Sequence, residues 1–315
     1  MKPKIGIVGA SGYTGETLIH LLGSHPEVEL TLISSRSFDG RILGSAIPAL
    51  RGSPAANLTF VDTDVEAFTG NTGIDTWFLA LPHGVAAEYA GHLVDAGMRV
   101  IDLSADFRLG RMELYRKYYG AGHPRPDLLE PAPYVIPELT DAAAWKDARL
   151  IACPGCYPTS ILLPLVPLLR AGWIGGNGII INSYSGVSGA GKKTEERYLF
   201  SERFGSLTPY AVTRHRHLSE IEEQLSHAAG ETVVVQFTPH LAPIHRGILT
   251  TITVHADAVS ADTVRESWST AFAGCPFIRV LPEGVFPDTA HVAGTNRADI
   301  AASADSRTGN LVITS

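Results

Sequence analysis

The chain has 315 residues, of which 45% are hydrophobic, and a formal net charge of -7 at pH 7. This length allows two domains with separate cores, and the negative charge argues against nucleic acid or an anionic membrane as a partner. No apolar run approaches the roughly 20 residues that span a bilayer, and three cysteines do not make a disulfide framework. Because Lys2-Pro3-Lys4 leads directly into an apolar segment, we expect no signal peptide and a cytoplasmic protein.

The first expected strand, at residues 4–8, leads into a glycine-rich turn and then a helix at 16–22. Gly9, Gly12 and Gly15 permit a tight turn, close approach of a pyrophosphate and close helix packing. The pyrophosphate is then expected at the helix N-terminus. The spacing is one residue wider than G-x-G-x-x-G, so its position after the first strand carries the prediction of a dinucleotide site.

The next expected strand, at 28–33, ends in Ser34-Ser35-Arg36-Ser37. An NAD site usually has an acidic residue here, which accepts hydrogen bonds from the ribose 2′-hydroxyl. This chain instead has hydroxyls and a guanidinium, which suit a 2′-phosphate through charge-assisted hydrogen bonds. The sequence therefore favours NADP(H) as cofactor over an ordinary polar loop.

Two later strand ends are also candidates for the ligand crevice of a parallel sheet. Residues 77–81 run into Pro82-His83-Gly84, and residues 99–103 run into a loop that contains Asp106 and Arg108. These two charged residues either pair with each other, or Arg108 binds a substrate anion through its planar fork.

A possible nucleophile follows the expected strand at 150–152. Cys156 lies in Pro154-Gly155-Cys156-Tyr157-Pro158, and a proline is well suited to the first position of a helix. A helix that begins at Pro158 leaves Cys156 in the positive field of its N-terminus, which stabilises a thiolate. A thiolate is the nucleophile that covalent acyl transfer needs.

From residue 177 the pattern changes to long β-branched runs, at 179–181, 232–235 and 248–254, which indicate a second, sheet-rich domain. The loop from Ser185 to Lys193 nearly matches a P-loop, but Lys193 stands where a magnesium-binding hydroxyl is needed. We therefore reject an NTPase and expect this loop to bring backbone near a ligand, with Lys192 or Lys193 close by.

Two histidines, His215 and His217, precede an expected helix. Ser219 and Glu222 form a capping-box pattern, which predicts that the helix begins after Ser219 and leaves both histidines on the loop. One of them is then a general acid/base for Cys156. The alternatives are a surface loop or a metal site; no Cys, Asp or third His at a recognised spacing supports a metal, so we expect none.

Taken in order, these segments resemble the N-acetyl-gamma-glutamyl-phosphate reductase family over almost the whole chain. The similarity is carried by GASGYTG, SSR, LPHG, DLSADFRL, PGCYPT, SGVSGAGKK, HRH with EIE, FTPHLAPIHRGI and VAGTN. PGCYPT and HRH at this separation are specific, whereas GASGYTG is not.

The resemblance implies an NADPH-dependent enzyme of arginine biosynthesis that reduces a small-molecule acyl phosphate to an aldehyde and releases phosphate. It implies that Cys156 is the nucleophile and His217 the general acid/base. The other implied site residues fall into two groups. Substrate contacts are expected from Arg108, His215, Lys192 and Arg246. Cofactor contacts are expected from Gly9, Ser11, Gly12, Tyr13, Thr14, Gly15, Ser35, Arg36, Pro82, Ser185, Gly186 and Asn296.

The expected fold class is α/β. A Rossmann-type dinucleotide-binding domain takes residues 1–156 together with 291–315. An α+β substrate and dimerisation domain with a mixed or antiparallel sheet takes residues 157–290. The resemblance also implies a homodimer or homotetramer, and a further helix beyond Ser315 that returns to the first domain.

One departure from the family concerns Cys153, which stands where the family usually has Asn. It is either an inert replacement or, because C-x-x-C spacing is used by dithiol sites, the partner of Cys156 in a reversible disulfide. Two other functions remain open from the sequence. One is an aspartate-semialdehyde dehydrogenase, whose nucleophile is expected after Asn; the other is a non-catalytic NADP-sensing Rossmann protein.

Overall fold

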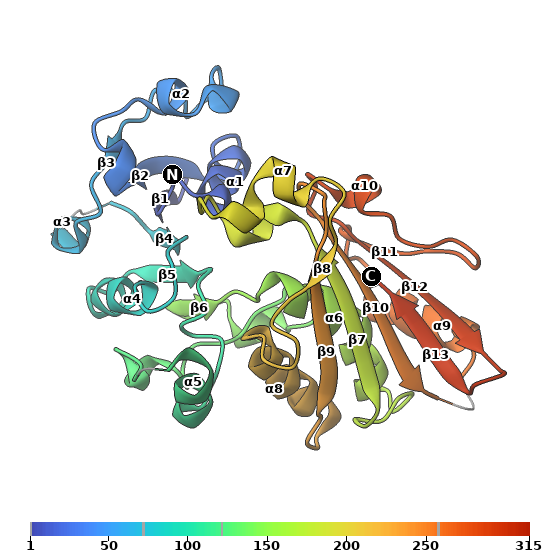
Figure 1. The fold of residues 1–315 in the computed structure, drawn as a ribbon. Helices are drawn as coiled ribbons and strands as arrows, with labels where there is room; N and C mark the ends of the chain where they lie inside the picture. The colour runs from blue at the N-terminus through green and yellow to red at the C-terminus, as the bar shows by residue number, and fades with distance from the viewer. Residues whose placement is uncertain (1, 71–72, 121, 257–258) are drawn as a thin grey trace. The chain divides into compact units, whose positions relative to one another are not determined.

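A computed structural model describes residues 2–70, 73–120, 122–256 and 259–315 of the chain (Figure 1). The chain divides into two compact units: Met1–Ile136 with Thr140–Pro154, and Pro137–Leu139 with Gly155–Ser315. The boundary therefore falls directly before Gly155, two residues earlier than expected. None of the helices in the described part of the chain has the length and apolarity needed to cross a membrane.

The first unit is built on a parallel six-stranded sheet. Its strands lie in the order β3-β2-β1-β4-β5-β6, and each neighbouring pair is parallel. This is the strand order of a Rossmann dinucleotide-binding domain, so the predicted class is confirmed for this unit. The strands are β1 Lys4–Val8, β2 Glu29–Ser34, β3 Phe60–Val61, β4 Thr76–Leu79, β5 Arg99–Asp102 and β6 Leu150–Ala152.

Both faces of this sheet are covered, because side chains alternate along each strand. Ile7 and Ile33 pack on one face in a cluster that includes Ile19 of α1, whereas Val8 and Trp77 belong to a cluster on α4. The helices of this unit are α1 Tyr13–Leu22, α2 Leu43–Ala46, α3 Val65–Gly70, α4 Ala86–Asp95 and α5 Met112–Tyr119, with short 3-10 helices at Arg36–Phe38, Pro48–Leu50, Pro126–Leu128 and Ala142–Ala144.

The second unit contains a seven-stranded mixed sheet, as the sequence predicts. The order is β11-β12-β13-β10-β7-β9-β8, with parallel pairing at β11–β12 and β7–β9 and antiparallel pairing elsewhere. The strands are β7 Ile179–Ser185, β8 Thr208–Pro209, β9 Val235–Leu241, β10 Ile248–His255, β11 Ile278–Val280, β12 Ala298–Asp305 and β13 Asn310–Thr314.

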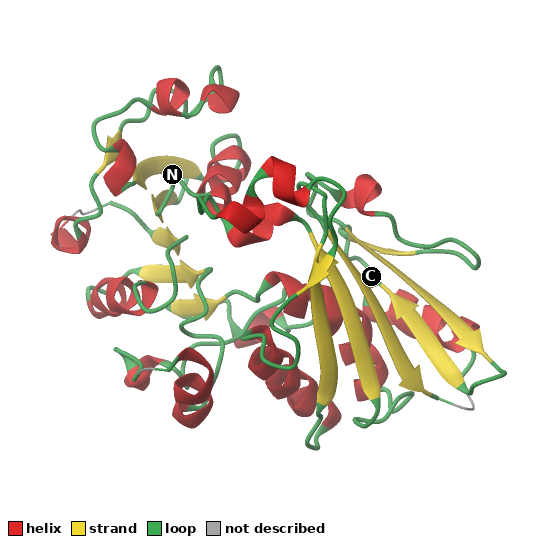
Figure 2. Ribbon diagram, viewed as in Figure 1, coloured by secondary structure: helices red, strands yellow, loops and turns green. Residues whose placement is uncertain are grey.

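Three helices of the second unit, α6, α8 and α9, pack on one face of this sheet (Figure 2). α6 is almost entirely buried, and the indole N–H of Trp268 in α9 donates to the Pro164 carbonyl within it (2.9 Å). The helices are α6 Cys156–Arg170, α7 Phe200–Arg203, α8 His217–Ala229, α9 Ala261–Ala271 and α10 Thr289–Val292, with 3-10 helices at Val187–Ala190 and Glu196–Tyr198.

The expected return of residues 291–315 to the dinucleotide-binding domain is wrong. Strand β13 pairs with β10 from Thr251↔Thr314 to His255↔Asn310, and β12 pairs with β13. These two strands extend the second sheet, and Leu311 and Ile313 are fully buried there. The alternating apolar side chains of the tail are thus buried in the core of the second unit rather than in that of the first.

Three predicted boundaries also shift. α6 begins at Cys156 rather than Pro158, α8 begins at His217 rather than after Ser219, and β9 begins at Val235 rather than 232. The capping box does not form, because the Ser219 hydroxyl donates to the Arg216 carbonyl (2.8 Å) and the Glu222 carboxylate accepts the Val235 N–H (3.2 Å).

Candidate active site

The glycine-rich turn after β1 has the shape that a dinucleotide needs. Gly9 has φ +83°, and a Cβ there would lie 2.4 Å from the Ala80 carbonyl oxygen. A Cβ at Gly15 would lie 2.5 Å from Cα of Ala10, so only glycine lets α1 approach the turn this closely. Gly12 is the N-cap of α1, and no side chain occupies this cap. The backbone of the turn and the helix N-terminus therefore fit a pyrophosphate.

Beside this turn, hydroxyl groups converge at the end of β2. The Ser35 hydroxyl lies 2.7 Å from that of Ser11 and 3.1 Å from that of Ser37. The Arg36 side chain is exposed, and its Nε donates to the Thr63 hydroxyl (2.9 Å). Tyr13 and Thr14 open α1 next to the same turn. The structure thus brings together most of the residues that the sequence predicts for the cofactor.

Asp106 organises the loop that follows β4. Its fully buried carboxylate accepts the N–H groups of Gly84 (2.7 Å) and Ala87 (2.9 Å) and the hydroxyl of Tyr115 (3.0 Å). The bond to Ala87 satisfies an amide at the start of α4, where a negative charge is also favoured by the helix dipole. Pro82 begins this loop, and its carbonyl accepts from Val85 (3.3 Å). Asp106 therefore has a structural task of its own.

Arg108 is buried and contacts the chain just before the candidate nucleophile. Its Nε donates to the Cys153 carbonyl (2.8 Å) and an Nη group donates to the Leu103 carbonyl (2.9 Å). Nearby, burial raises the pKa of Asp102 to about 7, although the Ser104 hydroxyl and N–H donate to that carboxylate (2.7 and 2.9 Å). Contact between Arg108 and a substrate anion stays a prediction.

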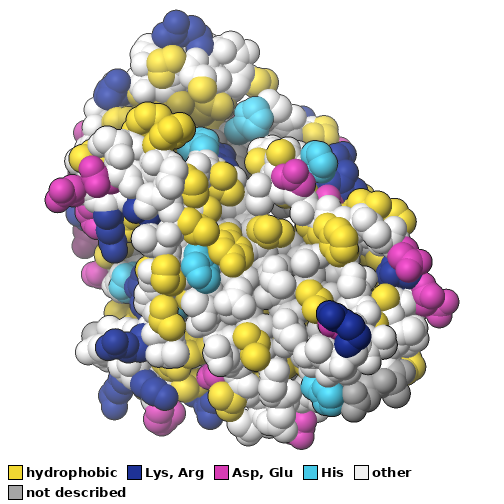
Figure 3. Space-filling model, turned by 45° about the vertical axis from the view of Figure 1, so that its right-hand side comes forward, with side chains coloured by type: hydrophobic (Ala, Val, Ile, Leu, Met, Phe, Trp, Pro, Cys, Tyr) yellow, Lys and Arg dark blue, Asp and Glu magenta, His cyan; other side chains and the backbone are white. Residues whose placement is uncertain are grey.

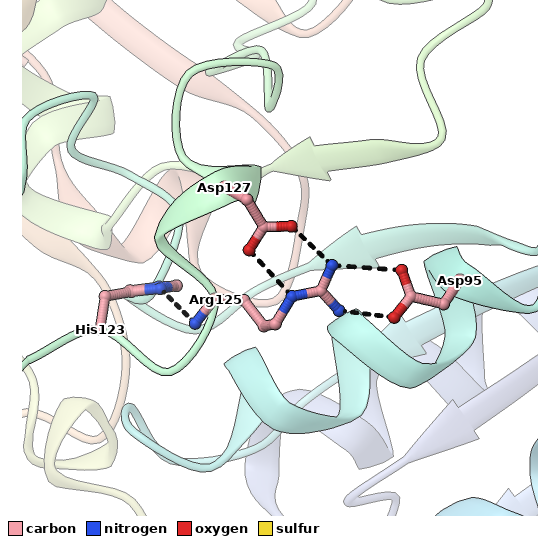
Figure 4. A network of polar contacts seen from close by, with 4 residues as sticks. All are labelled: Asp95, His123, Arg125 and Asp127. Atoms are coloured by element: carbon pink, nitrogen blue, oxygen red, sulfur yellow. Dashed lines mark hydrogen bonds and ion pairs between the residues drawn. The ribbon is translucent and has the colours of Figure 1, made fainter.

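A polar network that the sequence did not reveal holds the segment after α5 (Figure 4). His123 Nε2 lies 3.0 Å from the Asp106 carbonyl, and its Nδ1 accepts the N–H of Arg125 (3.0 Å). Arg125 in turn donates two hydrogen bonds to each of the carboxylates of Asp95 and Asp127. Because Nδ1 is an acceptor, His123 is neutral with its proton on Nε2, and burial lowers its pKa.

Cys156 is the first residue of α6, and its side chain is exposed. The preceding residue, Gly155, is the N-cap, and its N–H donates to a buried carboxylate oxygen of Glu220 in α8 (2.7 Å). The thiol therefore lies deeper in the field of the helix N-terminus than the sequence predicted, in a turn that α8 fixes. Glu220 was missed because 65 residues separate it from Gly155.

Tyr157 connects the cysteine turn to both candidate histidines. Its ring centroid lies 5.4 Å from that of His215 and 5.9 Å from that of His217, and the two histidine rings are 4.8 Å apart. The Tyr157 hydroxyl lies 2.8 Å from that of Tyr210. Burial raises the pKa of Tyr157, so its hydroxyl stays protonated. In the second unit, the residue that follows Cys156 is thus in ring contact with both histidines.

The two histidines differ in their environment. Nδ1 of His215 accepts the backbone N–H of His217 (3.2 Å), which caps the start of α8. Burial, with the neighbouring Arg216 charge, lowers the pKa of His215 to about 4. His215 is therefore neutral near neutral pH, with its proton on Nε2. His217 occupies the first position of α8, so the prediction that both histidines lie on the loop is wrong for His217.

The glycine-rich loop after β7 packs on the segment between β9 and β10. Gly186 donates to the Gly247 carbonyl (3.0 Å), and a Cβ on Gly186 would lie 2.9 Å from Cα of Arg246. The structure thus brings Ser185, Gly186 and Arg246 together. Lys192 follows on an exposed turn, and Asn296 is exposed after α10; both belong to the second unit.

Cys153 differs from Cys156 in its surroundings. Burial raises the pKa of the Cys153 thiol to about 12, and the neighbouring Asp102 carboxylate acts in the same direction. The three cysteines of the chain, all among the described residues, are not in disulfides. A half-buried thiol with a high pKa is a poor attacking group in thiol–disulfide exchange, which favours the inert replacement over the redox partner.

Comparison with known families agrees with this geometry. The family model described as "Semialdehyde dehydrogenase, NAD binding domain" matches residues 4–147, and "Semialdehyde dehydrogenase, dimerisation domain" matches residues 156–315. Together the fold, the glycine-rich turn and the cysteine at the N-terminus of α6 define a semialdehyde dehydrogenase-type protein.

Curated relatives narrow this class. N-acetyl-gamma-glutamyl-phosphate reductase of Akkermansia muciniphila is 48% identical over 99% of this chain and 90% of its own length. The reductases of Rhodospirillum rubrum and Moorella thermoacetica are 43% and 42% identical, over 98% and 99% of this chain and 88% and 89% of their own lengths. The chain belongs to the N-acetyl-gamma-glutamyl-phosphate reductase family.

Solved structures share the fold at low identity. Aspartate semialdehyde dehydrogenase II of Vibrio cholerae, complexed with ASA, gives a TM-score of 0.73 at 18% identity, covering 100% of this chain and 92% of that one. The Candida albicans aspartate semialdehyde dehydrogenase with NADP gives 0.68 at 17% identity, covering 100% and 93%. The two-unit architecture is therefore shared with these dehydrogenases.

Proposed function

We propose that this protein reduces N-acetyl-gamma-glutamyl phosphate to N-acetylglutamate semialdehyde with NADPH, releasing phosphate, as a step of arginine biosynthesis. One observation carries the proposal. In a chain of this family, an exposed thiol stands at the N-terminus of α6, and Tyr157 joins that turn to His215 and His217. This arrangement suits attack by a thiolate on an acyl carbon and proton transfer at the resulting oxygen.

In the first half of the reaction, the Cys156 thiolate attacks the carbonyl carbon of the acyl phosphate. A C–S bond forms, the C–O bond to phosphate breaks, and phosphate leaves with the bonding electrons. The result is a thioester on Cys156. The N-terminus of α6 favours the negative thiolate before attack, and the Glu220–Gly155 hydrogen bond fixes the turn that carries it.

In the second half, the thioester is reduced to a hemithioacetal and the aldehyde is released. The bound dinucleotide supplies the hydride. His217 protonates the oxygen that gains charge, and takes the proton back as the C–S bond breaks and the thiolate returns. His215, held neutral by burial, positions His217 through the hydrogen bond that its ring Nδ1 accepts from the His217 N–H, and contacts the substrate through its ring Nε2–H.

NADP(H) is the cofactor that the chain's residues fit. Gly9, Gly12 and Gly15 would cradle the pyrophosphate with Ser11, Tyr13 and Thr14 beside it, while Ser35 and Arg36 would bind the 2′-phosphate. Charge-assisted hydrogen bonds from a guanidinium are strong and directional, which favours a phosphate over a hydroxyl at this position. Pro82, Ser185, Gly186 and Asn296 complete the cofactor contacts of the proposal.

The substrate carries a carboxylate and a phosphate, which need cationic partners. Arg108, Lys192 and Arg246 supply them in this proposal. Arg108 is held in place by donating to the Cys153 and Leu103 carbonyls. The planar fork of Arg108 also suits a carboxylate or phosphate oxygen pair.

Self-association as a homodimer or homotetramer, in the cytoplasm, completes the proposal. Hydrophobic side chains reach the surface at several points (Figure 3). The most exposed large ones, Phe200 (79%) and Phe204 (75%), lie in the part that matches the dimerisation domain. Light scattering is expected to show a smaller particle for a Phe200→Ser/Phe204→Ser double variant, and no change for Phe286→Ser, an exposed control. Thiols outside any disulfide agree with a reducing compartment.

The test is phosphate-dependent reduction of NADP⁺ with N-acetylglutamate semialdehyde. We expect turnover by the wild type, none by Cys156→Ser, and wild-type rates for Cys275→Ser, which is the matched cysteine control. Turnover of aspartate semialdehyde in place of the acetylated substrate would instead assign an aspartate-semialdehyde dehydrogenase. Nucleotide binding by the wild type without any reductase activity would indicate a non-catalytic NADP sensor.

A further inference from the structure

The carboxyl ends of β2 and β3 lie side by side at one edge of the first sheet. The two strands are parallel, with Ser34 paired to Val61. Arg36 follows the end of β2 by two residues, and Thr63 follows the end of β3 by two residues. Equal offsets on neighbouring parallel strands bring these two side chains to the same level beyond the sheet edge.

At this edge the Arg36 guanidinium is held from one side. Its Nε donates to the Thr63 hydroxyl at 2.9 Å. Thr63 is itself fixed at both backbone polar groups: its carbonyl accepts the Tyr89 hydroxyl (2.7 Å) and its N–H donates to the Asp62 carboxylate (2.7 Å). Tyr89 is a buried residue of α4. The hydrogen bond from Tyr89 therefore ties Thr63, and through it the Arg36 guanidinium, to the packed helix layer next to the sheet.

The remaining donors of Arg36 are open for a ligand. Within the ranges of the chain that the structure describes, the two Nη groups make no hydrogen bond, and the side chain is exposed. The hydrogen bond to Thr63 holds the guanidinium at its Nε, and the edge formed by the two Nη groups remains for a ligand. Ser35 and Ser37, whose hydroxyls are 3.1 Å apart, add neutral donors at the same place. Such a fork is matched to the oxygens of a phosphate monoester.

We propose that Thr63 is a positioning residue that orients Arg36 toward the 2′-phosphate of NADP(H). This inference rests on the proposed NADPH specificity and assigns part of it to a residue outside the glycine-rich turn and the Ser35-Arg36 pair. Thr63 does not contact the phosphate. The hydrogen bond to its hydroxyl already restricts the Arg36 side chain before the phosphate binds. Binding therefore costs less conformational entropy, as expected of a preorganised site.

The experiment compares Thr63→Val, Thr63→Ser and Arg36→Ala in the full chain. Thr31→Val is the matched control, because Thr31 is exposed on β2 and its hydroxyl donates only to the nearby Glu29 carbonyl (3.2 Å). The probes are 2′,5′-ADP, which carries the 2′-phosphate, and 5′-ADP, which lacks it. Their dissociation constants are measured by titration calorimetry, and KM and kcat are measured for NADPH and NADH.

We expect Thr63→Val to weaken 2′,5′-ADP about 3- to 10-fold, the effect of one hydrogen bond, and to raise the NADPH KM equally. Its 5′-ADP affinity, NADH KM and kcat stay at wild-type values. Thr63→Ser, which keeps the hydroxyl, binds 2′,5′-ADP like the wild type. In an Arg36→Ala background, Thr63→Val has no further effect, because the two residues act through one interaction.

Three results would overturn the inference in distinguishable ways. If Arg36→Ala discriminates between the two probes but Thr63→Val does not, Thr63 has no positioning role and the NADPH proposal stands. If Arg36→Ala itself weakens both probes equally, the 2′-phosphate site is misassigned and the role of Thr63 fails with it. Equal loss of both probes in Thr63→Val would indicate a general structural role.

Discussion

Replacing His215 with asparagine separates the roles of the two histidines. Asparagine side chains accept backbone N–H groups two residues along the chain, so the cap on His217 is retained while the imidazole is removed. Because burial holds the pKa of His215 at about 4, the native ring is neutral near neutral pH and is a poor proton donor. We expect kcat to fall less than about tenfold in His215→Asn, and by about 10²- to 10⁴-fold in His217→Asn.

The same low pKa predicts a pH dependence of stability. An unfolded histidine titrates near 6.5, so the unfolded chain binds a proton that the folded chain binds only near pH 4. The free energy of unfolding therefore falls as the pH falls from about 6.5 toward about 4. Between about pH 7 and about pH 5, this difference in pKa amounts to about 2 kcal/mol.

Urea unfolding followed by circular dichroism, at about pH 7 and about pH 5, measures this difference. The wild type should lose about 2 kcal/mol more than His215→Asn over this interval, since the variant lacks the titrating group. Steady-state NADPH oxidation at about pH 7 supplies kcat for both histidine variants. The reasoning is refuted if His215→Asn is as inactive as His217→Asn, or if both proteins lose the same free energy on acidification.

Three further outcomes test the cofactor half of the protein. Arg36→Ala should raise the KM for NADPH about 10- to 100-fold and leave that for NADH within about twofold, because only NADPH carries the 2′-phosphate; equal changes would contradict this assignment. Gly9→Ala should abolish NADPH binding in calorimetry and destabilise the fold well beyond Gly40→Ala, a glycine of similar φ with open space around it, because a Cβ at Gly9 meets the Ala80 carbonyl at 2.4 Å. Asp106→Asn should lower the free energy of unfolding by about 2–3 kcal/mol, because an amide NH₂ replaces one of the two buried carboxylate oxygens that accept from Gly84, Ala87 and Tyr115; the exposed Glu113→Gln should match the wild type.

The first unit was largely predictable from the sequence because its signals are local. A buried strand, a glycine turn and a helix follow one another within residues 4–22, and Gly9 and Gly15 lie where a Cβ would meet backbone atoms at 2.4 and 2.5 Å. The place of Cys156 was also predictable, since a strand, a Pro-Gly turn and an apolar helix adjoin it. The helix start was misjudged by two residues because Pro158 is tolerated anywhere in the first turn, where amides have no helical partner.

The features that could not be predicted depend on contacts between distant segments. An alternating pattern at 298–314 predicts strands but not the sheet they join, and β13 reaches β10 by pairing that no local signal encodes. β3 has only two residues, so Thr63 could not be placed at a strand end beside Arg36. The Ser219–Glu222 pattern misled because Glu222 bonds the amide of Val235, at the start of β9.

The central claim is that Cys156 carries the acyl group, and intact-protein mass spectrometry tests it most directly. Wild-type protein mixed with N-acetyl-gamma-glutamyl phosphate, without NADPH, should gain the mass of one N-acetylglutamyl group. Peptide mapping should place that group on Cys156, and addition of NADPH should remove it. Cys156→Ser should gain no such mass, and Cys153→Asn should gain it like the wild type. Acylation that persists in Cys156→Ser, or that maps to another residue, would contradict the account.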